Sequence, residues 1–235
     1  MIYVTSDLHG YPLKDFLACL QKVNFSEEDF LFVLGDVIDR GTDGAALLRW
    51  MVQQPNVELI LGNHEAMLLS CSFLFASLSE ESAADIDEQK LKRLSAWLGN
   101  GAAPTLEGLR PILKEEPDVF MGILEYLQEA PLYDTVEVGG RKFVLVHAGL
   151  GNFSPDKPLE DYTPEELYWT RPTMETRYFE DATVVFGHTP TQFLVGWEEG
   201  GKMVQTDTWI CIDVGVIAGN KPVLLRLDDM QVFQE

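Results

Sequence analysis

The sequence predicts an α/β fold with a largely parallel sheet, a helical insert at about residues 66–130 and a second, more antiparallel sheet. Three observations support this prediction. An apolar strand, a polar turn and a helix follow one another three times before residue 66, as in parallel α/β folds. Strand-like runs then stop until residue 130, and several short ones follow. The 235 residues suit one domain, 1–235, that contains this insert.

The elements before residue 66 are expected to alternate between strand and helix. Proline can occupy the first position of a helix, so the first helix is expected to begin at Pro12. In chain order, the other expected elements are a strand at Met1–Ser6, a strand at Phe30–Leu34, a helix at Ala45–Val52 and a strand at Val57–Leu61.

The insert is expected to contain helices separated by breaks at Gly99–Pro104, Pro111 and Pro117, and to determine substrate choice. Its acidic run, Glu80–Glu88, is expected to be a solvated face or loop. After the insert, Gly139-Gly140 predicts a hairpin. The expected later strands are Asp134–Val138, Lys142–Val146, Thr183–Phe186 and short runs near Leu194, Val204, Ile210–Ile212, Val223–Leu227 and Val232.

Composition disfavours two classes of partner. The chain has 38 acidic and 17 basic residues, a formal net charge of −21, which repels nucleic-acid backbones and anionic membranes. It has neither a basic leader before an apolar run nor an apolar run long enough to span a bilayer. Cys19, Cys71 and Cys211 are scattered, which is typical of reduced core cysteines. We therefore expect a cytoplasmic protein without nucleic-acid or membrane partners.

All four histidines follow the end of an expected strand. A single histidine in such a place is usually structural, but four of four indicates a shared site. Neutral imidazole and carboxylate ligands suit Mn, Fe, Zn or Ni. With the nearby acidic and amide residues there are enough ligands for two metal ions, which a carboxylate such as Asp36 could bridge. The candidate residues are His9, His64, His147, His188, Asp7, Asp36 and Asn63.

Five motifs in order resemble the phosphoprotein-phosphatase family of calcineurin-like metallophosphoesterases, and specifically its bacterial serine/threonine protein phosphatase type. The resemblance implies a sandwich of two mixed β-sheets flanked by helices, with a helical insert or cap. It covers about residues 1–65 and 140–215. The motifs are Asp7-x-His9, Gly35-Asp36-x-x-Asp39-Arg40-Gly41, Gly62-Asn63-His64-Glu65, His147-Ala148-Gly149 and Gly187-His188.

The resemblance also implies a role for each site residue. One divalent ion, most often Mn²⁺, is held by Asp7, His9 and Asp36, and a second by Asp36, Asn63, His147 and His188. His64 is the general acid, which Asp39 orients. Arg40 and Arg171 hold the phosphate, with Arg177 as the alternative to Arg171. Asp213 gives structural support, and Trp169 and Trp197 are expected to serve in packing.

These roles imply a dinuclear-metal phosphomonoesterase, a serine/threonine or dual-specificity protein phosphatase that uses a metal-bridging hydroxide as nucleophile. The substrate is then a phosphorylated protein or a small phosphoester. One alternative is a symmetrical dinucleoside-tetraphosphate hydrolase, whose sequences usually lack the second Asp of GDxxDRG and carry Asp after GNH. Asp39 and Glu65 favour the phosphatase. A phosphodiesterase is a further alternative, and a non-catalytic metal-binding interaction module is the alternative of another class.

Overall fold

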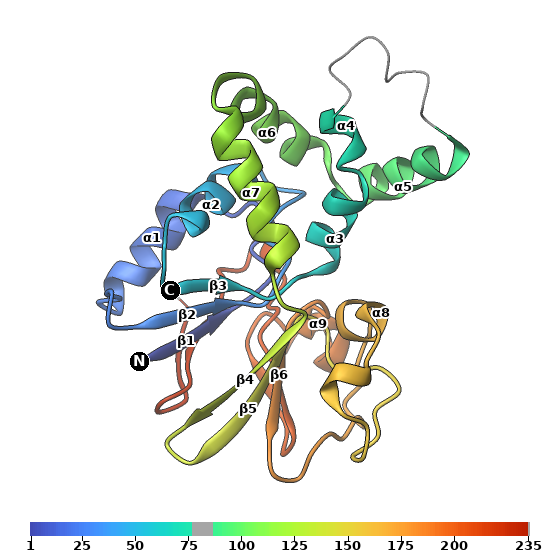
Figure 1. Cartoon of the computed structure of the whole chain (residues 1–235). Helices are drawn as coiled ribbons and strands as arrows, with labels where there is room; N and C mark the ends of the chain where they lie inside the picture. Colours follow the sequence, from blue (N-terminus) through green and yellow to red (C-terminus); the bar gives the residue numbers. More distant parts are fainter. Residues whose placement is uncertain (77–86, 235) are drawn as a thin grey trace.

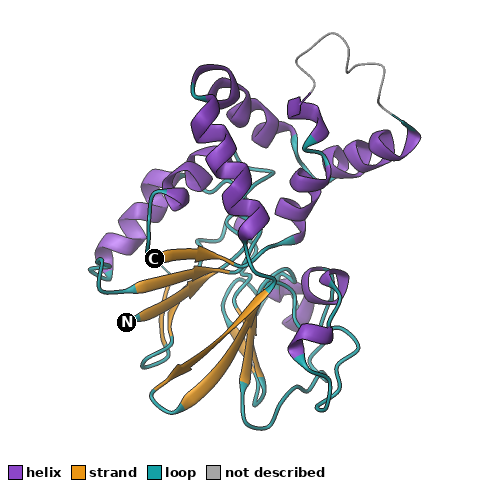
Figure 2. Ribbon diagram, in the orientation of Figure 1, coloured by secondary structure: helices purple, strands orange, loops and turns teal. Residues whose placement is uncertain are grey.

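The computed structural model of the chain describes residues 1–76 and 87–234. Within these residues the strands form two five-stranded mixed sheets (Figure 2). The first sheet has the order β10-β9-β1-β2-β3, in which β1, β2 and β3 are parallel and β9 pairs antiparallel with both β1 and β10. Its strands are β1 (Ile2–Thr5), β2 (Phe30–Val33), β3 (Val57–Leu59), β9 (Leu224–Arg226) and β10 (Gln231–Phe233).

The second sheet has the order β4-β5-β6-β8-β7, with three parallel central strands and antiparallel strands at both edges. Gly139 and Gly140 connect β4 to β5 with φ angles of 58° and 77°. A two-residue hairpin turn of type I′ requires positive φ at both positions, which glycine adopts readily. The strands are β4 (Tyr133–Val138), β5 (Arg141–Val146), β6 (Thr183–Phe186), β7 (Val204–Gln205) and β8 (Trp209–Cys211).

The two sheets pack face to face. Alternate side chains of each strand point to opposite faces, so each sheet has one apolar face that packs against the other sheet. Val4 and Phe32 of the first sheet share a buried cluster with Leu145 and Val185 of the second. The opposite face of the first sheet, which includes Tyr3, packs against helices. Both faces of the first sheet are therefore buried, which explains its almost uninterrupted apolar strands.

Helices α1, α2 and α7 cover the outer face of the first sheet, α6 packs against α2 and α7, and α5 extends beyond them (Figure 1). Among the described helices, none is long and apolar enough to cross a membrane. The helices are α1 (Leu13–Lys22), α2 (Gly44–Val52), α3 (Asn63–Ser70), α4 (Phe73–Ala76), α5 (Glu88–Gly99), α6 (Ala103–Glu115), α7 (Pro117–Glu129), α8 (Pro164–Tyr168) and α9 (Thr191–Val195), with short 3₁₀ turns at Leu159–Asp161 and Val216–Ala218.

The predicted fold class, two mixed sheets flanked by helices, is confirmed, with four local corrections. The second sheet is not more antiparallel than the first, because each sheet has two parallel and two antiparallel pairings. Pro111 does not break the insert but lies inside α6, where the neighbouring Leu109 and Ile112 are buried in the core and hold the helix together. Leu194 lies in α9 and not in a strand. The last two strands, β9 and β10, extend the first sheet and not the second. Most of the acidic run Glu80–Glu88 lies outside the described residues.

Candidate dinuclear metal site

The carboxyl ends of five strands from both sheets meet at one place. The turns that follow β1, β2 and β3 carry ligand candidates from the first sheet, and the ends of β5 and β6 carry them from the second. Open α/β sheets bind ligands at such strand ends. The general-acid candidate His64 and the six predicted metal ligands are each at most 5% exposed, and the six are Asp7, His9, Asp36, Asn63, His147 and His188.

The turns that carry these side chains have an unusual backbone. Among the described residues, nine other than glycine have positive φ, and six of those nine are predicted site residues. Such a conformation is costly for residues with a side chain and is concentrated at functional sites. Gly35, with φ 74°, shows the crowding, since a Cβ there would lie 2.6 Å from His147 Nδ1. The six residues are Asp7, His9, Asp36, Asp39, Arg40 and His188.

Acceptor atoms converge between the two sheets around His147. Its Nδ1 lies 2.7 Å from the carbonyl oxygen of Leu34, so the ring hydrogen is on Nδ1 and the Nε2 lone pair is free. That lone pair faces Asn63 Oδ1 at 2.9 Å, Asp36 Oδ1 at 3.4 Å and His188 Nδ1 at 3.3 Å. A cation between these atoms would relieve their mutual repulsion, so the donor set fits a metal ion.

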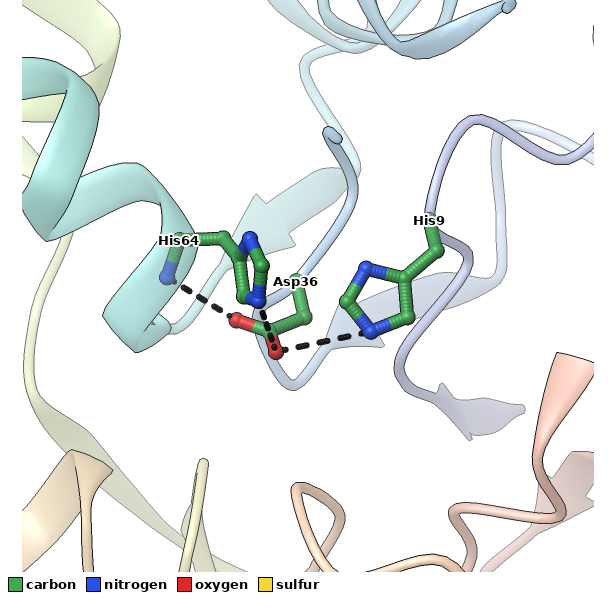
Figure 3. Close-up of side chains that lie close together, drawn as sticks. All are labelled: His9, Asp36 and His64. Atoms are coloured by element: carbon green, nitrogen blue, oxygen red, sulfur yellow. Dashed lines mark hydrogen bonds and ion pairs between the residues drawn. The ribbon is translucent and has the colours of Figure 1, made fainter. Parts of the chain in front are cut away.

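A second group of donors lies on the other side of the Asp36 carboxylate (Figure 3). His9 Nδ1 is 3.1 Å from the carbonyl oxygen of Ile38, which leaves its Nε2 lone pair 3.7 Å from Asp36 Oδ2. His64 Nε2 lies at the same distance from that oxygen. Asp36 therefore belongs to both groups, with one carboxylate oxygen toward each, which is the arrangement that a bridging ligand needs.

Burial sets the charge of these ligands. It raises the pKa of Asp36, and the nearby carboxylates of Asp7 and Glu65 raise it further. It also lowers the pKa of the His147 imidazole, to about 3, and that of His188, so both rings are neutral and can donate a lone pair. Buried carboxylates beside neutral imidazoles need positive charge, which a divalent ion supplies.

Asp7 is brought to the site but belongs to neither group of close donors. Both of its carboxylate oxygens accept the backbone N–H of His188, at 3.1 and 3.0 Å. Burial and the neighbouring Asp213 raise the pKa of Asp7. Asp213 itself accepts the N–H of Gly215 at 2.9 Å, and burial raises its pKa to about 6. Asp7 thus connects β1 to the β6 turn across the two sheets.

His64 is held by a buried network that involves the insert. Its Nδ1 lies 2.5 Å from Asp39 Oδ2, so Nε2 points toward the Asp36 carboxylate. The indole of Trp97 donates to the same Asp39 oxygen at 2.8 Å, and the Thr105 hydroxyl donates to Asp39 Oδ1 at 2.6 Å. All four side chains are at most 1% exposed. Neither Trp97 nor Thr105 belongs to a motif, so sequence analysis did not identify them.

Glu65 supports the turn that presents Asp36. Its Oε2 accepts the backbone N–H of Asp36 at 2.8 Å, and Oε1 accepts those of Val37 and Ile38 at 2.9 and 3.3 Å. The carboxyl is fully buried, and burial raises its pKa. Glu65 is therefore a structural support of the site, a role beyond the helix N-terminal carboxylate that its position suggests.

The candidate phosphate-binding arginines differ in position. Arg40 lies against the two histidines of the second donor group, with Nη1 3.0 Å from His9 Nε2 and Nη2 3.1 Å from His64 Nε2. Arg171 lies at the same site and donates to the carbonyl oxygen of His188 at 3.2 Å. Arg177 instead donates to the carbonyl oxygens of Met174 and Thr176, outside the site. The geometry thus favours Arg171 over the alternative Arg177.

A cavity of about 900 Å³ opens beside the two groups of candidate metal ligands. Its walls come mainly from the segments around residues 169–175, 188–197 and 213–218. From the described part of the insert, only Asn100 contributes to the lining, so the cavity walls lie mostly outside the segment expected to determine substrate choice. Trp169 and Trp197 line this cavity and are 43% and 71% exposed, so neither is buried in the core.

Residues 1–216 match the family model described as calcineurin-like phosphoesterase. A relative from Chromobacterium violaceum named symmetrical bis(5'-nucleosyl)-tetraphosphatase is 28% identical over 99% of this chain and 94% of its own length. Further relatives carry the same name.

Two solved structures share the fold. A candidate diadenosine tetraphosphatase superposes with a TM-score of 0.63 at 19% identity, over 100% of this chain and 92% of that one. A cold-active protein tyrosine phosphatase superposes with a TM-score of 0.55 at 17% identity, over 99% of this chain and 78% of that one. At these identities the likeness is one of fold.

Proposed function

The chain belongs to the calcineurin-like phosphoesterase family, and from this premise we propose that it is a symmetrical dinucleoside-tetraphosphate hydrolase. Water would cleave the central P–O–P bridge and give two nucleoside diphosphates. The observation that carries this choice is the cavity of about 900 Å³, because it extends beyond the phosphate-binding arginines to exposed aromatic side chains. The names of the full-length relatives support the same choice. This reading takes precedence over the protein phosphatase that the motifs favour.

The residues of the chain can perform this reaction together with two divalent ions. Bound at the two donor groups, the ions would supply Lewis acidity and lower the pKa of a coordinated water. Arg40 and Arg171 are placed to donate hydrogen bonds to the phosphoryl oxygens, where guanidinium groups bind bidentately. His64 Nε2 would give its proton to the leaving diphosphate oxygen, while Asp39 holds the ring by Nδ1.

A protein phosphatase is the second candidate, and the Asp39–His64 pair favours it. A serine or threonine alkoxide is a poorer leaving group than a diphosphate, so an oriented general acid is more valuable for phosphoprotein hydrolysis. Asp39 and Glu65, however, are both buried and do not line the cavity. Asp39 would orient His64, and Glu65 would hold the turn that carries Asp36, in either enzyme. The two residues are therefore weak indicators of the substrate.

A substrate panel separates the two candidates. The Mn²⁺-loaded protein would be given diadenosine tetraphosphate and peptides that carry phosphoserine, phosphothreonine or phosphotyrosine. We expect kcat/KM for the dinucleotide to exceed that for every peptide by at least about tenfold, or about 1.4 kcal/mol. Anion-exchange chromatography should show ADP as the product, without ATP or AMP.

Asp36→Asn is the control, because it removes the shared ligand and should abolish both activities. A preference for a phosphopeptide by the same margin would replace the proposal with the second candidate. Wild-type protein that binds two metal ions and hydrolyses none of these substrates would instead indicate a non-catalytic metal-binding module.

A further inference from the structure

Two exposed aromatic side chains stand side by side on one wall of the cavity. Phe193 lies in α9 and Trp197 just after it, and they are 68% and 71% exposed. Their ring centroids are 6.1 Å apart with an angle of 76° between the planes. Large aromatic rings normally bury most of their surface, so an exposed pair beside a ligand cavity indicates a binding surface. The catalytic roles described above do not use either ring.

The segment that carries this pair is fixed to the metal site. His188, a metal-ligand candidate, is only five residues before Phe193. The backbone N–H of Thr191 donates to the carbonyl oxygen of Asp213 at 2.8 Å, and Gln192 Nε2 donates to that of Val214 at 2.9 Å. Thr191 and Gln192 are 0% and 6% exposed. The aromatic pair is therefore held in a defined place beside the metal groups.

The cavity connects the pair to the arginines. Arg40, Arg171, Phe193 and Trp197 line the same cavity, whose volume is at the upper end of the range for small-molecule sites. A ligand that joins phosphates to an aromatic ring could contact the arginines and the pair at once. The wall also contains a buried acceptor, since Gln192 Oε1 has no hydrogen-bond partner among the described residues. A nucleotide offers all three features: phosphates, a stacking base and hydrogen-bond donors.

We propose that Phe193 and Trp197 form a nucleobase seat, on which one base of a nucleoside polyphosphate stacks while its phosphates reach the arginines and metal ions. This inference rests on the proposed function and assigns the residues that recognise the nucleoside. Stacking on an aromatic side chain tolerates any base, so the seat would accept purines and pyrimidines. Phe193 and Trp197 are specificity-determining residues here and take no part in the chemical step.

Binding of the product tests the seat without any turnover. Calorimetry on the Mn²⁺-loaded protein would compare ADP with inorganic pyrophosphate, which has the same phosphates but no base. We expect ADP to bind more tightly than pyrophosphate. Trp197→Ala and Phe193→Ala should each weaken ADP binding by about tenfold, the loss that stacking typically represents, and leave pyrophosphate binding unchanged.

Met121→Ala is the matched control, since Met121 is exposed on α7 and does not line the cavity. The inference is overturned if wild type binds ADP and pyrophosphate equally, or if the two aromatic substitutions leave ADP binding within twofold of the control. It is also overturned if they weaken both ligands equally.

Hydrolysis of diadenosine tetraphosphate by wild type is measured separately. Absence of that hydrolysis together with selective loss of ADP binding in Trp197→Ala would refute the proposed function and keep the nucleobase seat. Normal hydrolysis with no effect of either aromatic substitution on kcat/KM or ADP binding would refute the seat and keep the function.

Discussion

Trp97 and His64 contact the same carboxylate oxygen, Oδ2 of Asp39, at 2.8 and 2.5 Å. Trp97 comes from helix α5 of the insert, whereas His64 lies in the first turn of α3, the helix after β3. The backbone N–H of Arg40 also donates to the carbonyl oxygen of Gly101 in the insert, at 2.9 Å. The insert therefore holds the turn that carries Asp39 and Arg40, in addition to anything it contributes to substrate binding.

Trp97→Phe should lower the free energy of unfolding by about 1–3 kcal/mol, because the buried carboxylate of Asp39 loses a hydrogen-bond donor. Chemical denaturation measures this change. Trp50→Phe is the control, since Trp50 packs edge-on against Phe16 in the same core. Equal stability of the two variants would show that the indole hydrogen bond to Asp39 contributes nothing.

His64→Asn should retain both metal ions but reduce kcat by about 10²–10⁴-fold on substrates with a poor leaving group, such as alkyl phosphates. On an activated aryl phosphate the loss should be much smaller, because that leaving group needs no proton. His64 Nε2 also lies in one group of candidate metal ligands, so it could be either a general acid or a metal ligand. Metal content by elemental analysis separates these two roles. Loss of one metal ion would make His64 a ligand, and equal losses on both substrates would argue against an acid.

Glu65→Gln should weaken metal binding by about 10–100-fold, the usual effect of removing a group that orients a ligand. The amide would place N–H groups against the backbone N–H groups of residues 36–38, so the turn that presents Asp36 would shift. Metal titration monitored by calorimetry measures the effect. Glu107→Gln, on the exposed face of α6, is the control, and unchanged affinity in Glu65→Gln would contradict the supporting role.

Arg171→Met should lower kcat/KM by about 10–100-fold, because a charge-assisted hydrogen bond to phosphate contributes about 1.5–3 kcal/mol. Arg177→Met removes the same charge six residues away and outside the cavity, so its kinetics should match wild type. Steady-state kinetics on the same substrate compare the two. The reverse pattern would restore Arg177 as the phosphate-binding residue.

Metal ions should raise the melting temperature of the chelator-treated protein. At a free concentration of 100 times the dissociation constant, binding adds about 2.7 kcal/mol, which corresponds to about 5–10 °C for a chain of this size. Asp36→Asn, which lacks the shared ligand, should show little or no increase. Thermal denaturation with and without Mn²⁺ measures both, and equal shifts in the two proteins would place the ions elsewhere.

Asp39 and Glu65 do not by themselves distinguish the two candidate substrates. Asp39 and Glu65 favoured a protein phosphatase, whereas relatives along the whole chain are named tetraphosphatases. Both residues are buried and occupied by internal hydrogen bonds, one to His64 and the other to the turn of Asp36. They therefore describe how the catalytic centre is supported. The exposed aromatic residues of the cavity wall, such as Trp197, belong to none of the motifs.

The sequence by itself determined the fold class, the family and the set of chemical groups at the strand ends. It could do so because strand periodicity is local, and because the ligand motifs each lie within a few residues of one another. Only the tertiary structure decided which distant residues are in contact. Asp36 lies between the donor groups of His9 and His147, and Trp97 hydrogen-bonds to Asp39, 58 residues away in the sequence. Contacts between distant segments depend on how the two sheets and the insert pack, and side-chain packing leaves no periodic trace in the chain. The nucleobase seat that we propose belongs to the same class, since an exposed aromatic pair is recognisable only beside the cavity that it lines.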